Sequence, residues 1–182
     1  NDDGGGIKFE ALKRNFSNVS GSVGVSYFPN KTITLKANVS RGFRAPNASE
    51  LSSNGEHEGT SRYEIGKSDL KSETSLQFDA GLNFNYEHFS IDINAFYNSI
   101  NDFIFYRKLE AFGGGDSLVL NDGDLIQAFK FNQQDAKLAG FEASIDIHPH
   151  PLDWLHFENA VSFVRGRFDN PIDGSNNIPL IP

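Results

Sequence analysis

The fold class of this chain is decided by the stretch Leu76 to Tyr86, which reads LQFDAGLNFNY. Its even-numbered residues are all apolar or aromatic, whereas its odd-numbered residues are Gln, Asp, Gly, Asn and Asn. This alternation is typical of a β-strand with one apolar and one polar face, because a helix would mix the two sets on every side.

The same alternation recurs along the chain. We therefore expect six strands, near residues 17–28, 32–42, 73–86, 89–106, 127–148 and 154–168. No segment of comparable length has the 3.6-residue period of an amphipathic helix. The sequence thus predicts an all-β fold of antiparallel, up-and-down strands over residues 16–182, with residues 1–15 as a leading loop or strand end.

Short and long connections alternate between the expected strands. Short turns fall near residues 28–31, 87–88 and 148–151, whereas about 30 residues separate Phe43 from Ser72 and about 20 separate Arg107 from Leu125. All short links then lie at one end of the sheet and all long links at the other, as in transmembrane barrels. The apolar stripes have the length of about 9–11 residues that a tilted membrane strand needs. A soluble β-sandwich with one wet face is the alternative.

Composition excludes several classes of protein. The 182 residues include 24 acidic and 16 basic side chains, and the formal net charge of −8 argues against a nucleic-acid partner. Cysteine is absent, which excludes a disulfide framework and a thiolate metal site. No apolar run approaches the roughly 20 residues of a membrane helix. Methionine is also absent, even at position 1, and we interpret the chain as a piece of a longer protein.

Sequence motifs of enzymes are missing. We find no GxSxG, HExxH, P-loop or GxGxxG pattern, and the carboxylates of Asp79, Asp92 and Asp146 alternate with apolar residues as ordinary polar-face side chains. The chain is therefore predicted not to be an enzyme. Transport, binding of carbohydrate or protein by a soluble β-domain, and a β-rich hydrolase are the three hypotheses, and the last lacks a nucleophile motif.

Three motifs stand apart from the alternating pattern. The first is SRGFRAPNASEL at residues 40–51, the second is YEIGKSDLKSE at residues 63–73, and the third is NQQDAKLAGFE at residues 132–142. Together they resemble the TonB-dependent outer-membrane receptors, and the closing IPLIP resembles the end of a loop in that family. The residues that carry the resemblance are Arg41, Gly42, Phe43, Arg44, Ala45, Pro46, Glu50, Leu51, Gly66, Leu70, Glu73, Asn132, Gly140 and Glu142.

The resemblance implies a specific setting. Such receptors close about 22 strands around a plug in the outer membrane of a Gram-negative bacterium, in contact with outer-membrane lipid. The TonB energy-coupling complex is the implied partner, and it acts through a plug that we do not find in this chain. We expect six strands of that barrel here, and no cofactor. The implied function is active import of an iron complex, a ferric siderophore, with haem or zinc as alternatives. Lys67-Ser68-Asp69 departs from the family's Asn-Pro-rich triplet.

One candidate ligand site lies between the first two motifs. His57 is flanked by Glu56 and Glu58 in a connection that is expected to face the outside. Imidazole nitrogen and carboxylate oxygen are donors that suit zinc, and imidazole is also an axial ligand of haem iron. We expect these three residues to contribute to capture of a metal or haem, although a solvated loop tip would have the same composition.

Overall fold

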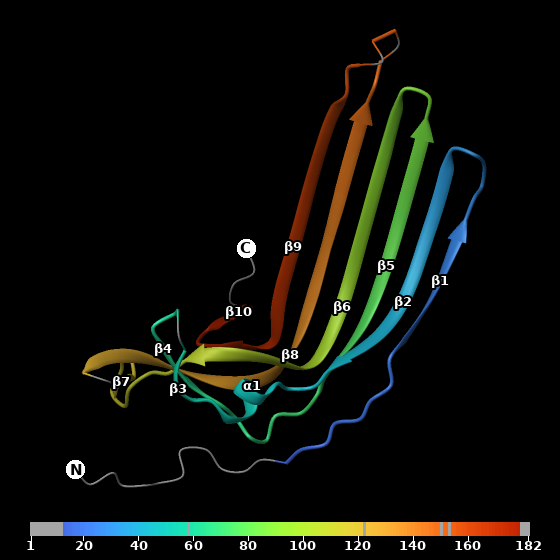
Figure 1. Cartoon of the computed structure of the whole chain (residues 1–182). Helices are drawn as coiled ribbons and strands as arrows, with labels where there is room; N and C mark the ends of the chain where they lie inside the picture. Colours follow the sequence, from blue (N-terminus) through green and yellow to red (C-terminus); the bar gives the residue numbers. More distant parts are fainter. Residues whose placement is uncertain (1–12, 58, 122, 150, 153, 179–182) are drawn as a thin grey trace. The chain divides into compact units, whose positions relative to one another are not determined.

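The computed structural model describes residues 13–57, 59–121, 123–149, 151–152 and 154–178 (Figure 1). Helix α1 (Ala48–Ser52) is the one helix among them, and no helix in these residues is long and apolar enough to cross a membrane. The strands are β1 (Gly21–Tyr27), β2 (Ile33–Arg44), β3 (Asn54–His57), β4 (Arg62–Ile65), β5 (Glu73–Tyr86), β6 (Phe89–Lys108), β7 (Leu118–Asn121), β8 (Asp124–Ile147), β9 (Phe157–Ile172) and β10 (Ser175–Asn177).

The chain divides into two compact units. We call residues 18–43, 74–101 and 135–182 the hairpin unit, and residues 1–17, 44–73 and 102–134 the connection unit. Each is described by itself below.

The hairpin unit consists of three antiparallel hairpins, β1–β2, β5–β6 and β8–β9. They lie side by side in one layer, and their turns are all at the same end of that layer (Figure 1). The expected antiparallel, all-β fold class is thus confirmed, and the sheet is open rather than closed in this chain. The described residues form a single ten-stranded sheet, whereas the sandwich alternative would need two sheets packed face to face.

The first turn follows from the chemistry of Asn30. Its side-chain Oδ1 accepts hydrogen bonds from the backbone N–H groups of Thr32 and Ile33, both at 2.9 Å. An Asn side chain that bonds its own backbone in this way stabilises a tight reversal of the chain. The turn between β8 and β9 is longer than expected, because β9 begins at Phe157 rather than near residue 154.

Register keeps the two faces of the hairpin unit separate. Apolar residues oppose one another across strands, as in the pairs Phe78↔Tyr97 and Phe141↔Phe163. The other face is polar, and there Asn38 Nδ2 donates to Asp79 Oδ2 at 3.0 Å. The apolar side chains are exposed within the described residues, and they include Val23, Val25, Tyr27, Leu35, Leu76, Phe78, Tyr97, Phe141, Phe157, Val161 and Phe163.

The connection unit contains strands beyond the six expected and corrects one expectation. The long connections contain secondary structure, because β3 and β4 form a hairpin in the first and β7 pairs with the start of β8 in the second. In addition, β4 pairs with β8 in parallel, with Tyr63 opposite Ala128, so the sheet is not antiparallel throughout. These strands have only four residues each, too few to be recognised by alternation, and β4 pairs with a segment of β8 that is far away in the sequence.

Gly140 fixes a close approach between two strands of the hairpin unit. A Cβ at this position would lie 2.6 Å from the backbone oxygen of Phe163 and 2.7 Å from the ring of Phe96. The Phe163 oxygen belongs to the strand ladder and cannot move without disturbing the pairing of β8 with β9. Gly140 is therefore required by packing.

We expect Gly140→Ala to destabilise the folded protein by about 1–3 kcal/mol, the usual cost of overpacking. The measurement is the free energy of unfolding in urea, followed by circular dichroism of the protein in detergent micelles. Gly21→Ala is the matched control, because nothing lies within 4 Å of a Cβ at that strand position. Equal unfolding free energies for the two variants would contradict this account.

Candidate functional site

The centre of the connection unit is one arginine held between two glutamates. Nη1 of Arg44 donates to Glu50 Oε1 and Oε2 at 2.8 and 2.9 Å. Its Nε and Nη2 donate to Glu73 Oε2 and Oε1 at 2.8 and 2.7 Å. Glu50 and Glu73 are buried, being 8% and 9% exposed, and the planar guanidinium satisfies both carboxylates at once. The first and second motifs are thus joined through one side chain.

Glu50 also caps helix α1. Asn47 Oδ1 accepts a hydrogen bond from the Glu50 N–H at 2.8 Å, and Glu50 Oε2 accepts one from the Asn47 N–H at 2.8 Å. This reciprocal pair is a capping box, which satisfies backbone donors at the start of a helix. The same carboxylate therefore orders α1 and binds Arg44.

An apolar cluster completes this part of the connection unit. Leu51 from the first motif, Leu70 from the second and Ile104 from β6 are buried together, and Leu70 is fully inaccessible to solvent. Phe16 and Phe131 pack against them. Because burial of one such side chain contributes about 1.5–3 kcal/mol, the cluster and the ion pairs hold the two motifs together.

Gly66 lets the second motif run directly against the end of α1. A Cβ at this residue would lie 2.5 Å from the Ser52 nitrogen and 2.6 Å from the Ser53 nitrogen. In that position the Gly66 N–H donates to the Ser53 oxygen at 2.7 Å, and the next residue's N–H donates to the Glu50 oxygen at 2.8 Å. Any larger residue would displace this backbone contact.

The other residues of the motifs lie apart from this centre. Arg41 Nη2 donates to Asn18 Oδ1 at 3.2 Å in the hairpin unit, and Asn132 Oδ1 accepts from Lys67 Nζ at 3.4 Å in the connection unit. Glu142 is exposed and lines a hollow on the polar face of the hairpin unit. Gly42 and Phe43 lie in β2, and Ala45 and the buried Pro46 follow its end.

Of the three candidate ligands, the structure describes Glu56 and His57, and these two do not form a chelating pair. Glu56 and His57 are neighbours in β3, so their side chains point to opposite sides of the strand. Glu56 Oε2 accepts a hydrogen bond from Asn121 Nδ2 at 2.9 Å, and His57 Nδ1 lies 3.3 Å from Thr60 Oγ1. Glu58 lies outside the described residues. His57 is exposed, and its role as a ligand stays a prediction.

Three basic residues surround a second hollow in the connection unit. Lys67, Arg107 and Lys130 line it together with Leu109, Phe131 and Asn132. The ring of Phe131 is in edge-on contact with Tyr106, at 6.2 Å between ring centroids. We call Lys67, Arg107 and Lys130 the basic cluster. Concentrated positive charge next to aromatic surface suits an anionic, aromatic ligand.

Sequence reasoning did not find the basic cluster. Its members are dispersed over more than 60 positions of a chain with a net charge of −8, and neither Lys67 nor Lys130 has a basic neighbour in the sequence. They meet because β6 and β8 are neighbours in the sheet and the second motif folds back toward them. No local pattern in the sequence signals this meeting.

Comparison with known proteins supports the fold and gives the family. The family described as "TonB dependent receptor-like, beta-barrel" matches residues 1–182. A comparison with curated protein sequences found no match.

Among solved structures, the chain is similar to the "Copper transporter OprC", with a TM-score of 0.61 and 20% identity over 81% of this chain. It is also similar to the siderophore receptor PirA from Acinetobacter baumannii, with a TM-score of 0.55 and 22% identity over 81% of the chain. It is similar as well to a variant of the ferric enterobactin receptor PfeA from Pseudomonas aeruginosa, with a TM-score of 0.56 and 23% identity over 81% of the chain. The chain spans only 20%, 23% and 22% of the respective structures.

Hairpins that have short turns at one end and are joined by long, structured connections are typical of one class of protein, the large antiparallel β-barrels. Within that class, the match over all 182 residues shows that the chain belongs to the TonB-dependent receptor family, as a part of its β-barrel. The resemblance inferred from the three motifs is confirmed. The family consists of receptors and not of enzymes.

We expect Arg44→Met to lower the free energy of unfolding by about 3 kcal/mol. This is the lower end of the range for breaking a buried ion pair, because the Arg44 side chain is itself 44% exposed. Lys71→Met is the matched control. Lys71 Nζ lies 3.9 Å from Asp102 Oδ1 at the surface, and loss of such a pair costs about 1 kcal/mol or less. If both variants unfold at the same urea concentration, Arg44 does not hold the motifs together.

Proposed function

We propose that this chain forms part of the barrel of a TonB-dependent receptor in the outer membrane of a Gram-negative bacterium. The receptor imports an anionic ferric-siderophore complex, and energy reaches it from the TonB complex through a plug outside this chain. The basic cluster is the observation that carries the choice of cargo.

The exposed apolar face of the hairpin unit supports the membrane setting. Exposure of a face of Val, Leu, Phe and Tyr side chains to water is unfavourable, and large apolar patches of this kind mark contact with a membrane or with another protein. Against outer-membrane lipid the same face is stabilising, and the polar face then lines the inside of the barrel.

The basic cluster supports an anionic cargo. Ferric catecholate complexes carry negative charge and aromatic rings, so three cations and Phe131 in the lining of one hollow offer both kinds of contact. The guanidinium of Arg62 lies 5.0 Å from the centroid of the Tyr106 ring, which in turn contacts Phe131. Lys67, Arg107 and Lys130 are the residues that we assign to the cargo.

Haem or zinc is the second candidate cargo. The observation that favours it is the exposed imidazole of His57 at the end of β3, beside a polar groove lined by Ser49, Ser52 and Glu64. A siderophore would need no imidazole, so His57 distinguishes the two candidates.

The face assignment predicts a contrast between neighbouring residues. We expect Leu82→Arg to impair insertion of the whole receptor, because a charge on the lipid face near mid-bilayer costs about 2–4 kcal/mol. Asn83→Arg should be tolerated, since Asn83 faces the polar side and its Nδ2 already donates to Asp92 Oδ1 at 2.8 Å. The measurement is the fraction of receptor recovered folded in outer membranes. Equal losses in the two variants, or a larger loss in Asn83→Arg, would contradict this assignment of the two faces.

The cargo assignment predicts the outcome of uptake assays. In the whole receptor, Lys67→Gln with Lys130→Gln should weaken binding of a ferric catecholate by at least roughly tenfold, since 1.4 kcal/mol corresponds to a factor of ten. His57→Ala should leave that binding unchanged. Lys31→Gln, in the turn between β1 and β2, removes a charge elsewhere and is the control.

Two results would overturn the proposed cargo. One is unchanged binding and uptake in the double lysine variant. The other is an unmodified receptor that takes up haem or zinc but no siderophore, together with loss of that uptake in His57→Ala. This result would favour haem or zinc as the cargo.

A further inference from the structure

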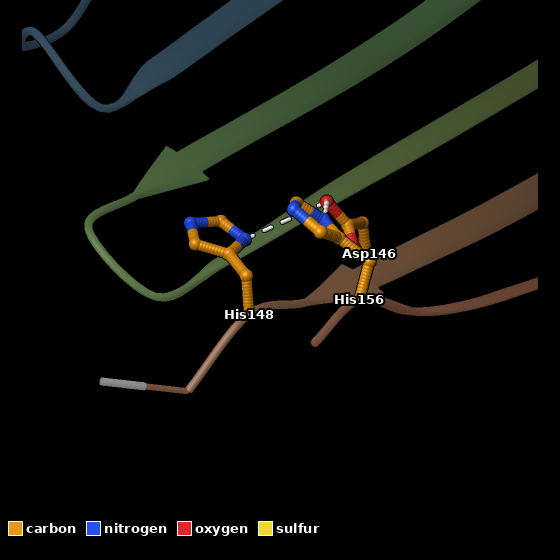
Figure 2. Close-up of side chains that lie close together, drawn as sticks. All are labelled: Asp146, His148 and His156. Carbon is orange, nitrogen blue, oxygen red and sulfur yellow. Dashed lines mark hydrogen bonds and ion pairs between the residues drawn. The ribbon is translucent and has the colours of Figure 1, made fainter. Parts of the chain in front are cut away.

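Two histidines and an aspartate meet where β8 ends and β9 begins in the hairpin unit (Figure 2). Asp146 and His148 flank the last residue of β8, and His156 directly precedes β9. His156 Nδ1 lies 3.3 Å from Asp146 Oδ2, and His148 Nδ1 lies 3.5 Å from the same oxygen. All three potential ligand atoms lie within 4.8 Å of one another.

The orientation of His148 is set by its other ring nitrogen. Nε2 lies 2.8 Å from the backbone oxygen of Glu87, and an oxygen can only accept, so Nε2 carries the proton. In the neutral ring Nδ1 then has a free lone pair. That atom is buried and has no hydrogen-bond partner, although it faces a carboxylate oxygen at 3.5 Å. Two acceptors in this arrangement repel each other unless a cation or a second ring proton lies between them.

A histidine with one ring nitrogen bonded to a backbone oxygen and the other facing a carboxylate is typical of protein metal sites. A ligating histidine commonly donates its second N–H to a backbone carbonyl, which fixes the tautomer and aims the other nitrogen at the metal. Bond lengths of about 2.0–2.1 Å around tetrahedral zinc place neighbouring ligand atoms about 3.3 Å apart. The two distances to Asp146 Oδ2, 3.3 and 3.5 Å, match that spacing.

Hydrogen bonds and ring stacking hold the two histidines in place. The backbone N–H of His148 donates to the His88 oxygen at 2.9 Å, so both its ring and its backbone bind the turn between β5 and β6. The rings of His148 and His156 stack with centroids 5.5 Å apart. Glu158 lies opposite Asp146 in the register of β8 and β9, which adds a second carboxylate to the same face.

We propose that Asp146 Oδ2, His148 Nδ1 and His156 Nδ1 bind a divalent transition-metal ion, with zinc as the expected metal. Two imidazoles and one carboxylate form a set of three protein ligands that leaves a fourth tetrahedral position open to water. Imidazole donors select such metals over calcium or magnesium, which prefer all-oxygen sites. The ion would join the β8–β9 turn to the β5–β6 turn through His148. This inference does not depend on the identity of the imported cargo.

The test measures zinc binding by the whole receptor, purified in detergent and stripped with a chelator. Isothermal titration with Zn²⁺ is compared for the unmodified receptor, Asp146→Asn, His156→Asn and the control Glu142→Gln. Glu142 is a carboxylate on the same strand and the same face, but it lies outside the cluster. Each ligand variant should lose at least roughly tenfold in affinity, because even loss of a residue that only supports a ligand costs about 10–100-fold. The control should bind as the unmodified receptor does.

Substitution with Co²⁺ gives a second readout that is independent of affinity. The visible absorption of tetrahedral Co²⁺ should appear in the unmodified receptor and in Glu142→Gln, and should be lost in His156→Asn. The folded state of each variant is checked by its heat-modifiable migration in gels, and His156 is half-exposed, so its replacement should leave the barrel folded. The proposal is overturned if the unmodified receptor binds no zinc, or if the ligand variants bind zinc as tightly as the control does.

Discussion

The connection unit depends on one arginine that is ion-paired and hydrogen-bonded to two buried carboxylates. Without Arg44, Glu50 and Glu73 would be two negative charges in each other's vicinity, with little access to water. With it, the end of β2, the start of α1 and the start of β5 are fixed at one point. The backbone N–H of Ile104 also donates to Glu73, so that β6 joins the same point. Because both ends of the long connection are fixed, it has much less conformational entropy than an open loop of that length.

That constraint explains why the long connection holds ordered structure. Between its fixed ends, the chain packs Leu51 and Leu70 into a small apolar cluster, and Gly66 permits backbone contact with the end of α1. The short hairpin of β3 and β4 then pairs in parallel with β8. The basic cluster is a consequence of this folding back, because Lys67 is brought to the strands that contain Arg107 and Lys130. The residues of the two motifs are thus structural supports for the surface that we assign to the cargo.

The hairpin unit follows a different constraint, the separation of its two faces. In each hairpin most apolar residues lie opposite apolar residues, and a slip of one position would move the whole apolar set to the polar side. Gly140 shows how tightly two of these strands approach, since it has room for no side chain. At the turn end, Asp146, His148 and His156 form the one cluster of metal-ligand type among the described residues, and the backbone carbonyl of Glu87 in a neighbouring turn orients the His148 ring.

The sequence by itself determined the strands of the three hairpins, their faces and the family. Period-two alternation is a local property, so LQFDAGLNFNY identifies its strand and its apolar face without knowledge of any partner. The three motifs likewise carry the family in short contiguous runs. Only the tertiary structure decided which distant residues meet. The bridge from Arg44 to Glu73, the parallel pairing of β4 with β8, the basic cluster and the trio at the β8–β9 turn each depend on register and on chain reversal. Local sequence does not encode the register between strands that are dozens of residues apart, because the choice is made by packing and charge pairing in the folded chain.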